Sequence, residues 1–175
     1  MKFLEDTHGD GRYDKATVFL EPVPFPTGVT AYGRGVQVCA APDILYAEDT
    51  NGDGRADRVE KLFSGFATEN YQARVNSLSL GLDHWLYGAN GLIGGVIRGM
   101  SGTNLVSISG RDFRFQVETR RFEPEYGLTQ QGRVRDDFGN WFGRDNTRIR
   151  RSAARPFAVR PGWAHSQLSR WSSWR

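Results

Sequence analysis

The chain has 175 residues, of which 38% are hydrophobic and 13% aromatic, and it contains 21 glycines. This composition favours short strands and tight turns over long helices. No segment approaches the roughly 18 consecutive apolar residues of a membrane-spanning helix, and the first residues lack the apolar run of a signal peptide. The single cysteine, Cys39, excludes a disulfide framework and a cysteine metal site, and its apolar neighbours predict a buried thiol.

The net charge of +3 is unevenly distributed along the chain. The last 29 residues contain seven arginines and no carboxylate, which leaves 16 basic and 20 acidic residues, a formal charge of −4, in residues 1–146. We therefore expect a domain over residues 1–146 and a basic tail, rich in Arg, Ser and Trp, over residues 147–175. We interpret the tail as disordered or non-native sequence. A nucleic-acid-binding arm is the alternative, which we do not favour.

Taken in chain order, residues 1–20 predict a strand, a loop and a second strand. Three prolines then exclude a helix over Glu21–Gly28. The later strands are expected to be short, apolar and separated by turn residues. They are Val29–Tyr32, Val36–Ala40, Ile44–Ala47, Val59–Phe63, two strands around a turn within Val75–Gly88, Leu105–Ser109 and Asp112–Val117.

Two acidic loops, Asp6–Asp14 and Asp49–Asp57, repeat the same pattern 43 residues apart. Side-chain oxygens at alternate positions, with a glycine at the sharp turn, suit a hard cation such as Ca²⁺. The second loop matches the full calcium-loop pattern with Glu60 at its twelfth position, whereas the first has a histidine, a poor calcium ligand, at its third. The predicted ligands are Asp49, Asn51, Asp53, Arg55, Asp57 and Glu60 in the second loop, and Asp6, His8, Asp10 and Asp14 in the first.

Two other interpretations of these loops are open. An EF-hand pair needs a helix on each side of each loop, and the prolines and glycines between the loops disfavour helices. Metal-free turns rich in Asp and Gly are the second possibility. We expect hairpin loops between adjacent strands, in which a structural cation neutralises carboxylates that otherwise repel one another.

The repeat distance also predicts an architecture, because roughly 40–45 residues form one four-stranded propeller blade. A second internal similarity supports this interpretation. Gly81–Gly88 and Asp136–Gly143 both contain a carboxylate, a short turn, a tryptophan and a glycine. We therefore predict an all-β fold, a partial β-propeller of about three to four blades with calcium-binding-type hairpin loops.

Six segments of the chain together carry a family resemblance. They are Phe3–Lys15, Cys39–Tyr46, Asn70–Asn76, Gly88–Gly91, Gly110–Phe115 and Gly127–Asp137. Together they resemble the membrane-bound dehydrogenase domain of planctomycete-type bacteria, which is similar to the quinoprotein glucose/sorbosone dehydrogenase β-propeller. The resemblance implies a fragment of a periplasmic or cell-envelope protein that oxidises sugars or alcohols with pyrroloquinoline quinone (PQQ). It also implies the rest of the parent polypeptide, or a c-type cytochrome, as partner.

The catalytic site is not found by this resemblance. Quinoprotein sugar dehydrogenases have a histidine shortly before the segment that matches Gly81–Tyr87, and Ala73–Asn76 stands there instead. Polar loop residues are expected to converge on one face, with Arg74, Asn76 and Arg133 as the cofactor-binding candidates. The others in this set are Asn90, Gln130, Gln131, Arg135 and Asp137. The alternative function is a non-catalytic, calcium-stabilised propeller module that binds carbohydrate or protein.

Overall fold

The computed structural model describes residues 1–100, 104–146 and 149–152. These residues form 15 β-strands and no helix. The all-β prediction is confirmed, and the helices that an EF-hand pair needs do not occur in this part of the chain. No helix that could cross a membrane is found among the same residues. Of the tail predicted over residues 147–175, only residues 149–152 are described, and the rest lies outside the described residues.

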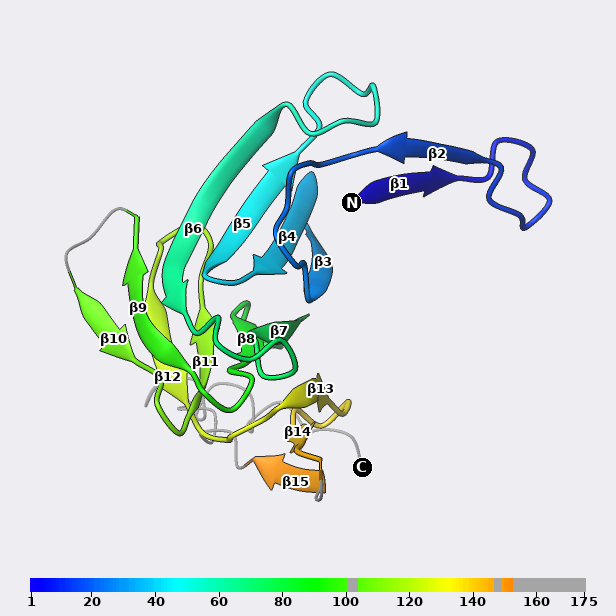
Figure 1. Cartoon of the computed structure of the whole chain (residues 1–175). Coiled ribbons are helices and arrows are strands. Elements are labelled where there is room, and N and C mark those ends of the chain that lie inside the picture. Colours follow the sequence, from blue (N-terminus) through cyan, green and yellow to red (C-terminus); the bar gives the residue numbers. More distant parts are fainter. Residues whose placement is uncertain (101–103, 147–148, 153–175) are drawn as a thin grey trace, which may run out of the picture.

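The first two sheets contain the acidic repeat. A two-stranded sheet stands out to one side in Figure 1 and consists of β1 (Lys2–Glu5) and β2 (Lys15–Val18). A six-stranded antiparallel sheet has the order β10-β9-β6-β5-β4-β3. Its strands are β3 (Gly28–Tyr32), β4 (Gly35–Ala40), β5 (Asp43–Glu48), β6 (Arg58–Phe66), β9 (Gly95–Gly99) and β10 (Leu105–Ser107).

The other two sheets are shorter. A four-stranded sheet has the order β12-β11-β8-β7, and a three-stranded sheet has the order β13-β14-β15. Neither closes on itself. Their strands are β7 (Asn76–Leu80), β8 (Leu86–Ala89), β11 (Asp112–Phe115), β12 (Phe122–Glu125), β13 (Gln131–Arg135), β14 (Trp141–Arg144) and β15 (Ile149–Ser152).

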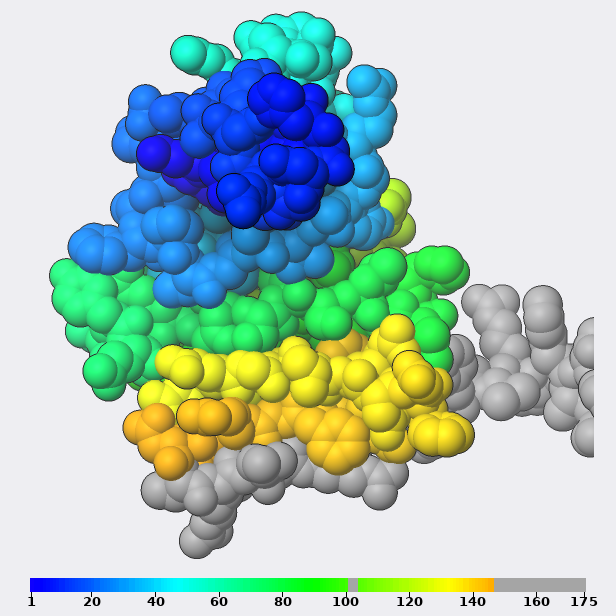
Figure 2. Space-filling model, turned by 90° about the vertical axis from the view of Figure 1, so that its right-hand side faces the viewer, coloured from blue at the N-terminus to red at the C-terminus, as the bar shows by residue number. Residues whose placement is uncertain are grey.

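The sheets follow one another in space as they do in sequence, which Figure 2 shows as successive bands from blue through green to yellow. Strand β3 lies beside β7, and the hydroxyl of Thr30 donates to the carbonyl of Leu78 at 2.7 Å. Strand β7 in turn lies beside β13, where the N–H of Gly132 donates to the hydroxyl of Ser77 at 3.0 Å. The first strands of three successive sheets are therefore neighbours.

Aromatic side chains fill the space between the six-stranded and four-stranded sheets. Phe63 of β6 is fully buried, and its ring lies 5.0 Å from those of Phe115 and Phe122. Phe113 stacks on Phe122 at 5.3 Å. Rings of this size bury large apolar areas, so they contribute much of the stability of this layer. Cys39 belongs to the same core, and burial raises the pKa of its thiol to about 12, as expected of an inert thiol.

The predicted repeats are hairpins. The turn between β7 and β8 and the turn between β13 and β14 are the two similar segments, and in each pair the register shifts near the start of the first strand. Ser77 and Gly132 occupy these bulges with φ of +55° and +71°. Strands β9, β12, β13 and β15 were not predicted, because glycines, a proline and charged residues interrupt their apolar pattern. Strand β15 lies within residues 147–175, which we interpreted as a tail, and it pairs with β14.

Gly65 offers a test of the packing between β6 and β9. It lies in a bulge of β6 at φ +111°, and a Cβ atom there would lie 2.1 Å from the carbonyl oxygen of Val96. We expect Gly65→Ala to lower the free energy of unfolding by about 2 kcal/mol or more, measured by urea unfolding. Gly99→Ala is the control, because its Cβ would meet Phe63 at an ordinary 3.6 Å. Equal losses in both variants would contradict the assignment of strain to Gly65.

Candidate functional site

The two acidic loops close the same hairpin. The first joins β1 to β2 and the second joins β5 to β6, which confirms that they connect adjacent strands. With the offset of 43 residues, each of the four strand pairs of the first hairpin has its counterpart in the second. Phe3 opposite Thr17, for example, corresponds to Tyr46 opposite Glu60. Identical register over both hairpins means that the repeat is structural as well as sequential.

Each loop is closed by its first aspartate. Asp49 accepts the N–H groups of Asn51, Gly52 and Gly54 at 2.7–3.2 Å. Asp6 accepts the four N–H groups of residues 8–11 at 2.7–3.3 Å. The last aspartate of each loop closes it a second time: Asp57 accepts from the N–H and hydroxyl of Thr50, as Asp14 does from Thr7. Backbone groups that a tight turn leaves without partners are thereby satisfied.

These hydrogen bonds determine how the loops respond to pH. Donation by Gly54 holds the pKa of Asp49 below its ordinary value, and donation by Gly11 does the same for Asp6. The pKa values of Asp14 and Asp57 are lowered chiefly by their threonine donors. A lowered pKa in the folded chain gives stability that is present above the ordinary pKa and is lost as the pH falls through the lowered one.

The predicted calcium ligands are only partly brought together. Asn51 and Asp53 accept the N–H groups two residues further on, and Arg55 is the donor to Asp53 at 2.8 Å. Glu60 lies on β6 and accepts from Arg120 at 2.7 Å, so the structure directs this side chain to an arginine rather than to the loop. Among the described residues, no three His, Cys, Asp or Glu side chains gather closely enough to hold a metal ion.

The first loop differs from the second at its third position. His8 contacts the carboxylate of Asp14 through its Nδ1 atom, whereas the corresponding Asn51 accepts from the N–H of Asp53 at 2.9 Å. His8 is largely exposed, and so is Asp10, which accepts from the N–H of Arg12 at 2.9 Å. The carboxylate of Asp14 therefore has contacts with both Thr7 and His8, whereas the corresponding carboxylate of Asp57 accepts from Thr50.

The second loop also joins two sheets. The N–H of Ala56 donates to the carbonyl of Phe19 at 2.8 Å, beyond the end of β2. The backbone of Gly54 lies against Thr17, whose Cγ2 would be 3.4 Å from a Cβ atom at this glycine. The loop therefore fixes the β1–β2 sheet against the six-stranded sheet.

A second candidate site lies where the loops lead into β3, β7 and β13, which we call the loop face. Asn76 ties two of these loops, because its amide donates to the carbonyls of Arg74 at 2.8 Å and Gln130 at 2.7 Å. The hydroxyl of Thr27 donates to the carbonyl of Val75 at 2.5 Å. The loops before three successive strands are thus hydrogen-bonded to one another.

Close packing at the loop face depends on one glycine. Gly91 has φ +80°, and a Cβ atom there would lie 2.5 Å from the carbonyl carbon and oxygen of Ala73. Its N–H donates to the carbonyl of Thr129 at 3.1 Å. A larger residue would push the loop after β8 away from the loop that precedes β7.

Two aromatic rings stand exposed on the loop face around an arginine. Phe25 and Tyr71 are 60% and 65% exposed, and their ring centroids are 4.8 Å apart. The guanidinium of Arg74 lies 4.4 Å from the ring of Tyr71 and 5.0 Å from that of Phe25. It is held by donation to the carbonyl of Thr68 at 2.8 Å, while its Nε is buried without a partner. The contacts with Arg74 hold the exposed rings of Phe25 and Tyr71 in a fixed geometry. Surface aromatic rings without such contacts are free to rotate.

Arg133, the third cofactor-binding candidate, is enclosed instead. Its side chain has no exposed surface and forms an ion pair with the equally buried Asp112. Asp112 also accepts from the N–H groups of Asn90 and Thr129, at 3.2 and 3.0 Å. The guanidinium lies 5.3 Å from the ring of Trp141. It joins the four-stranded sheet to the three-stranded one, and no ligand reaches it in this geometry.

The expected convergence of polar residues is therefore incomplete. Arg74, Asn76, Asn90 and Gln130 do lie at the loop face. Arg135 lies at the far end of β13, where it donates to the carbonyl of Leu80 at 3.4 Å, and Asp137 follows it in the turn. Gln131 begins β13 and is exposed. The prediction is wrong for Arg135 and Asp137, because the length of β13 separates them from the loop face.

The described histidines also lie away from the loop face. His84 occupies the turn between β7 and β8 at φ +62°, and His8 is in the first acidic loop. The sequence did not reveal the aromatic pair, because Phe25 and Tyr71 are far apart along the chain. It also gave no sign that Asp112 is buried beside Arg133.

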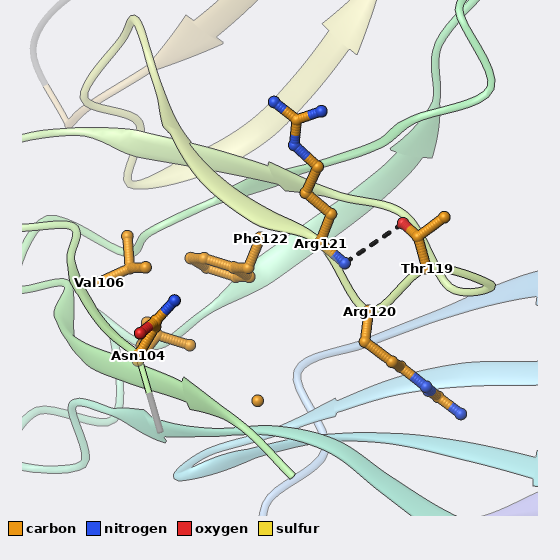
Figure 3. A pocket seen from close by; sticks show the side chains of 8 residues that line it. Asn104, Val106, Thr119, Arg120, Arg121 and Phe122 are labelled. Carbon is orange, nitrogen blue, oxygen red and sulfur yellow. Dashed lines mark hydrogen bonds between the residues drawn. The ribbon is translucent and has the colours of Figure 1, made fainter. Parts of the chain in front are cut away.

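A pocket of about 320 Å³ lies elsewhere, between the β9–β10 hairpin and the turn from β11 to β12. Figure 3 shows Val106, Phe122 and Asn104 gathered on one side of it, while the side chains of Arg120 and Arg121 extend away from one another. Both arginines already pair with carboxylates, Glu60 and Glu123. The pocket is therefore mainly apolar and presents no uncompensated charge to a ligand.

The fold and both sites define the chain as an all-β protein of successive antiparallel sheets, with duplicated, aspartate-closed hairpins. Residues 1–166 match the family described as a domain of unknown function, DUF7133, and the chain belongs to this family. The match covers residues 1–146 and 20 residues of the predicted tail. No curated protein and no solved structure gives a significant match.

The buried pair of Asp112 and Arg133 gives a test of the junction between the sheets. We expect Asp112→Asn to lower the free energy of unfolding by about 3–5 kcal/mol, because it leaves a buried guanidinium uncompensated. Adding Arg133→Met should restore part of this loss. The control is Arg121→Gln, which removes an exposed ion pair and should cost no more than about 1 kcal/mol. A small loss in Asp112→Asn, measured by urea unfolding, would show that the pair is hydrated.

Proposed function

We propose that the chain is a propeller-like module that binds a small polyhydroxy ligand, a sugar or sugar alcohol, at its loop face. The observation that carries the proposal is the exposed pair of Phe25 and Tyr71 around Arg74. Aromatic faces offer a flat apolar surface for the C–H groups of a sugar ring. Convergent amide and hydroxyl groups nearby are the polar component that such a site needs.

Polar groups surround the aromatic pair. The side chain of Gln72 is exposed at the same loop, and its backbone carbonyl accepts from the amide of Gln130 at 3.3 Å. The Oε1 atom of Gln130 is buried without a partner. Asn70 accepts the N–H of Gln72 at 2.9 Å. Amides can donate to and accept from hydroxyl groups, which favours a sugar over a purely apolar ligand.

The propeller architecture is part of this proposal. Strands β3 to β6 and strands β7, β8, β11 and β12 each form a four-stranded antiparallel series, and β3, β7 and β13 are neighbours. This order is what blades around a common axis would have, with the first strand of each blade innermost. The loop face would then lie at one end of that axis.

Oxidation of the ligand with PQQ is the second candidate, supported by the resemblance and by the position of Arg74 and Asn76 at the loop face. The residues fit this cofactor poorly. PQQ is anionic, but Arg133 is compensated by Asp112 and enclosed. Asn76 uses its amide on two backbone carbonyls. Arg74 at Nε, and Arg133 at Nε and Nη2, have N–H groups without a partner, but all three atoms are buried.

Calcium in the hairpin loops remains a proposal as well. The donor set of the second loop, carboxylate and amide oxygens, has the hardness that Ca²⁺ prefers. These oxygens already accept backbone N–H groups, and Glu60 is held by Arg120, so a cation must recruit Asp49, Asn51, Asp53 and Asp57 without a twelfth-position ligand. Bound there, it would stiffen the junction between the first two sheets. A periplasmic or cell-envelope location is proposed on the resemblance alone.

Sugar binding is tested by titrating a panel of monosaccharides, oligosaccharides and sugar alcohols, followed by NMR or calorimetry. We expect Tyr71→Ala and Phe25→Ala each to lower the affinity of the best ligand by about tenfold. Phe138→Ala is the control, since this side chain is 90% exposed in the turn between β13 and β14. Added PQQ and a dye acceptor separate the two candidates, because only a dehydrogenase would reduce the dye. Absence of any binding, or equal losses in the control, would contradict the sugar proposal.

Calcium binding is tested by thermal unfolding with millimolar Ca²⁺ or with chelator. We expect Ca²⁺ to raise the melting temperature of the wild type, because a ligand that binds only the folded state stabilises it. Asp49→Asn should abolish most of this rise and Asp6→Asn less of it. Asp137→Asn is the matched control, with the same change of charge at an exposed residue outside the loops. Identical melting curves with Ca²⁺ and with chelator would contradict the proposal.

A further inference from the structure

The outer surface of the β5–β6 hairpin is covered within this chain. Leu45, Ala47 and Ala56 pack in one apolar cluster with Phe19 and Leu20, which follow β2. Ala47 is fully buried, and Leu20 is 8% exposed. A hydrogen bond from Ala56 to Phe19 adds to this contact. The segment that follows the β1–β2 hairpin therefore packs on the β5–β6 hairpin.

In the β1–β2 hairpin, the side chains that correspond to Ala47 and Ala56 by the 43-residue offset are exposed to solvent. Leu4 corresponds to Ala47 and is 48% exposed, and Tyr13 corresponds to Ala56 and is 72% exposed. Gly11 corresponds to Gly54, and a Cβ atom there would meet nothing within 4 Å. The atoms of this hairpin stand uncovered toward the viewer in Figure 2, where they are darkest blue.

The strand edges differ in the same way. Strand β5 pairs with β4 along the edge that faces away from β6, from Asp43 opposite Ala40 to Glu48 opposite Gly35. Strand β1 pairs with β2 alone in the described part of the chain. An exposed edge of unpaired N–H and C=O groups is a template for another strand. Both the face and the edge that are used in the second hairpin are therefore open in the first.

We infer that Leu4, Gly11, Tyr13 and the free edge of β1, here called the hairpin docking face, receive another β-sheet unit of the same 43-residue kind. The contact between the two hairpins in this chain shows which residues and strand the added unit needs. It needs an aromatic residue and a leucine after a strand, as at Phe19–Leu20, with a free carbonyl. It also needs a strand like β4 to pair with β1.

The proposed contact repeats the one between the end of β2 and the β5–β6 hairpin, so successive units would be arranged head-to-tail. A contact of this kind uses two different surfaces and can therefore continue from unit to unit. A further copy of this chain does not supply the partner end, because Phe19 and Leu20 of each copy are already packed under its own second hairpin. The fitting partner is a unit whose corresponding end is free. This inference is independent of the sugar-binding proposal, because it concerns another surface.

The experiment adds such a unit to the intact chain. A second copy of residues 1–43 is placed before Met1, which puts a β2-like end and a β4-like strand beside the hairpin docking face. We expect amide hydrogen exchange in β1 and at Tyr13 of the original hairpin to slow by about tenfold or more, because docking protects exposed backbone groups. The melting temperature should rise as well.

The matched control is the same extended chain with Phe19→Asp and Leu20→Asp in the added copy only. It has the same length, but its end cannot enter an apolar contact, so exchange in the original hairpin should return to the rate of the unextended chain. Equal slowing in both extended chains would overturn the inference. An added copy that remains unfolded by circular dichroism beside an intact original chain would also overturn it, because a fitting face would order that copy.

Discussion

Four turns in the described part of the chain are closed by an aspartate that accepts one or more N–H groups of its own turn, and the arrangement of the sheets depends on them. Asp6 and Asp49 close the acidic loops, and Asp83 and Asp136 close the turns before Trp85 and Trp141. A tight turn leaves several donors without backbone partners, and a carboxylate satisfies them at once. Each turn then fixes the register of its hairpin, and the register decides which side chains face the core.

Contacts between sheets differ in kind from one junction to the next. The six-stranded and four-stranded sheets are held by phenylalanine rings, whereas the buried pair of Asp112 and Arg133 supports the next junction. The loop face is a consequence of this stacking, because it forms where the loops before β3, β7 and β13 meet. Asn76 spans two of those loops and so makes the face one surface. Exposed rings on that surface are held by packing, which is the condition for selective binding.

The duplicated hairpin shows how one local structure serves two purposes. In its second copy, the loop carries a sheet-to-sheet contact through Ala56 and Gly54. In its first copy, the same backbone is exposed and carries His8 and Tyr13 instead. The hydrogen bonds inside the two loops are nearly the same, so the difference arises from what lies beside them. The conformation of the loop is therefore local, and its role is set by its neighbours.

The acidic hairpins and most of the turns could be predicted from the residues alone. The spacing of Asp, Gly and Trp residues gave both pairs of hairpins, and the prolines excluded helices, because turn chemistry acts within a few residues. Which polar residues are available to a ligand depends instead on how the sheets pack. Arg133 forms a buried ion pair with Asp112, and Glu60 accepts a hydrogen bond from Arg120. Phe25 packs against Tyr71 on the surface. These pairs join residues distant in the sequence, and their meeting depends on the packing of whole sheets, which no local pattern encodes.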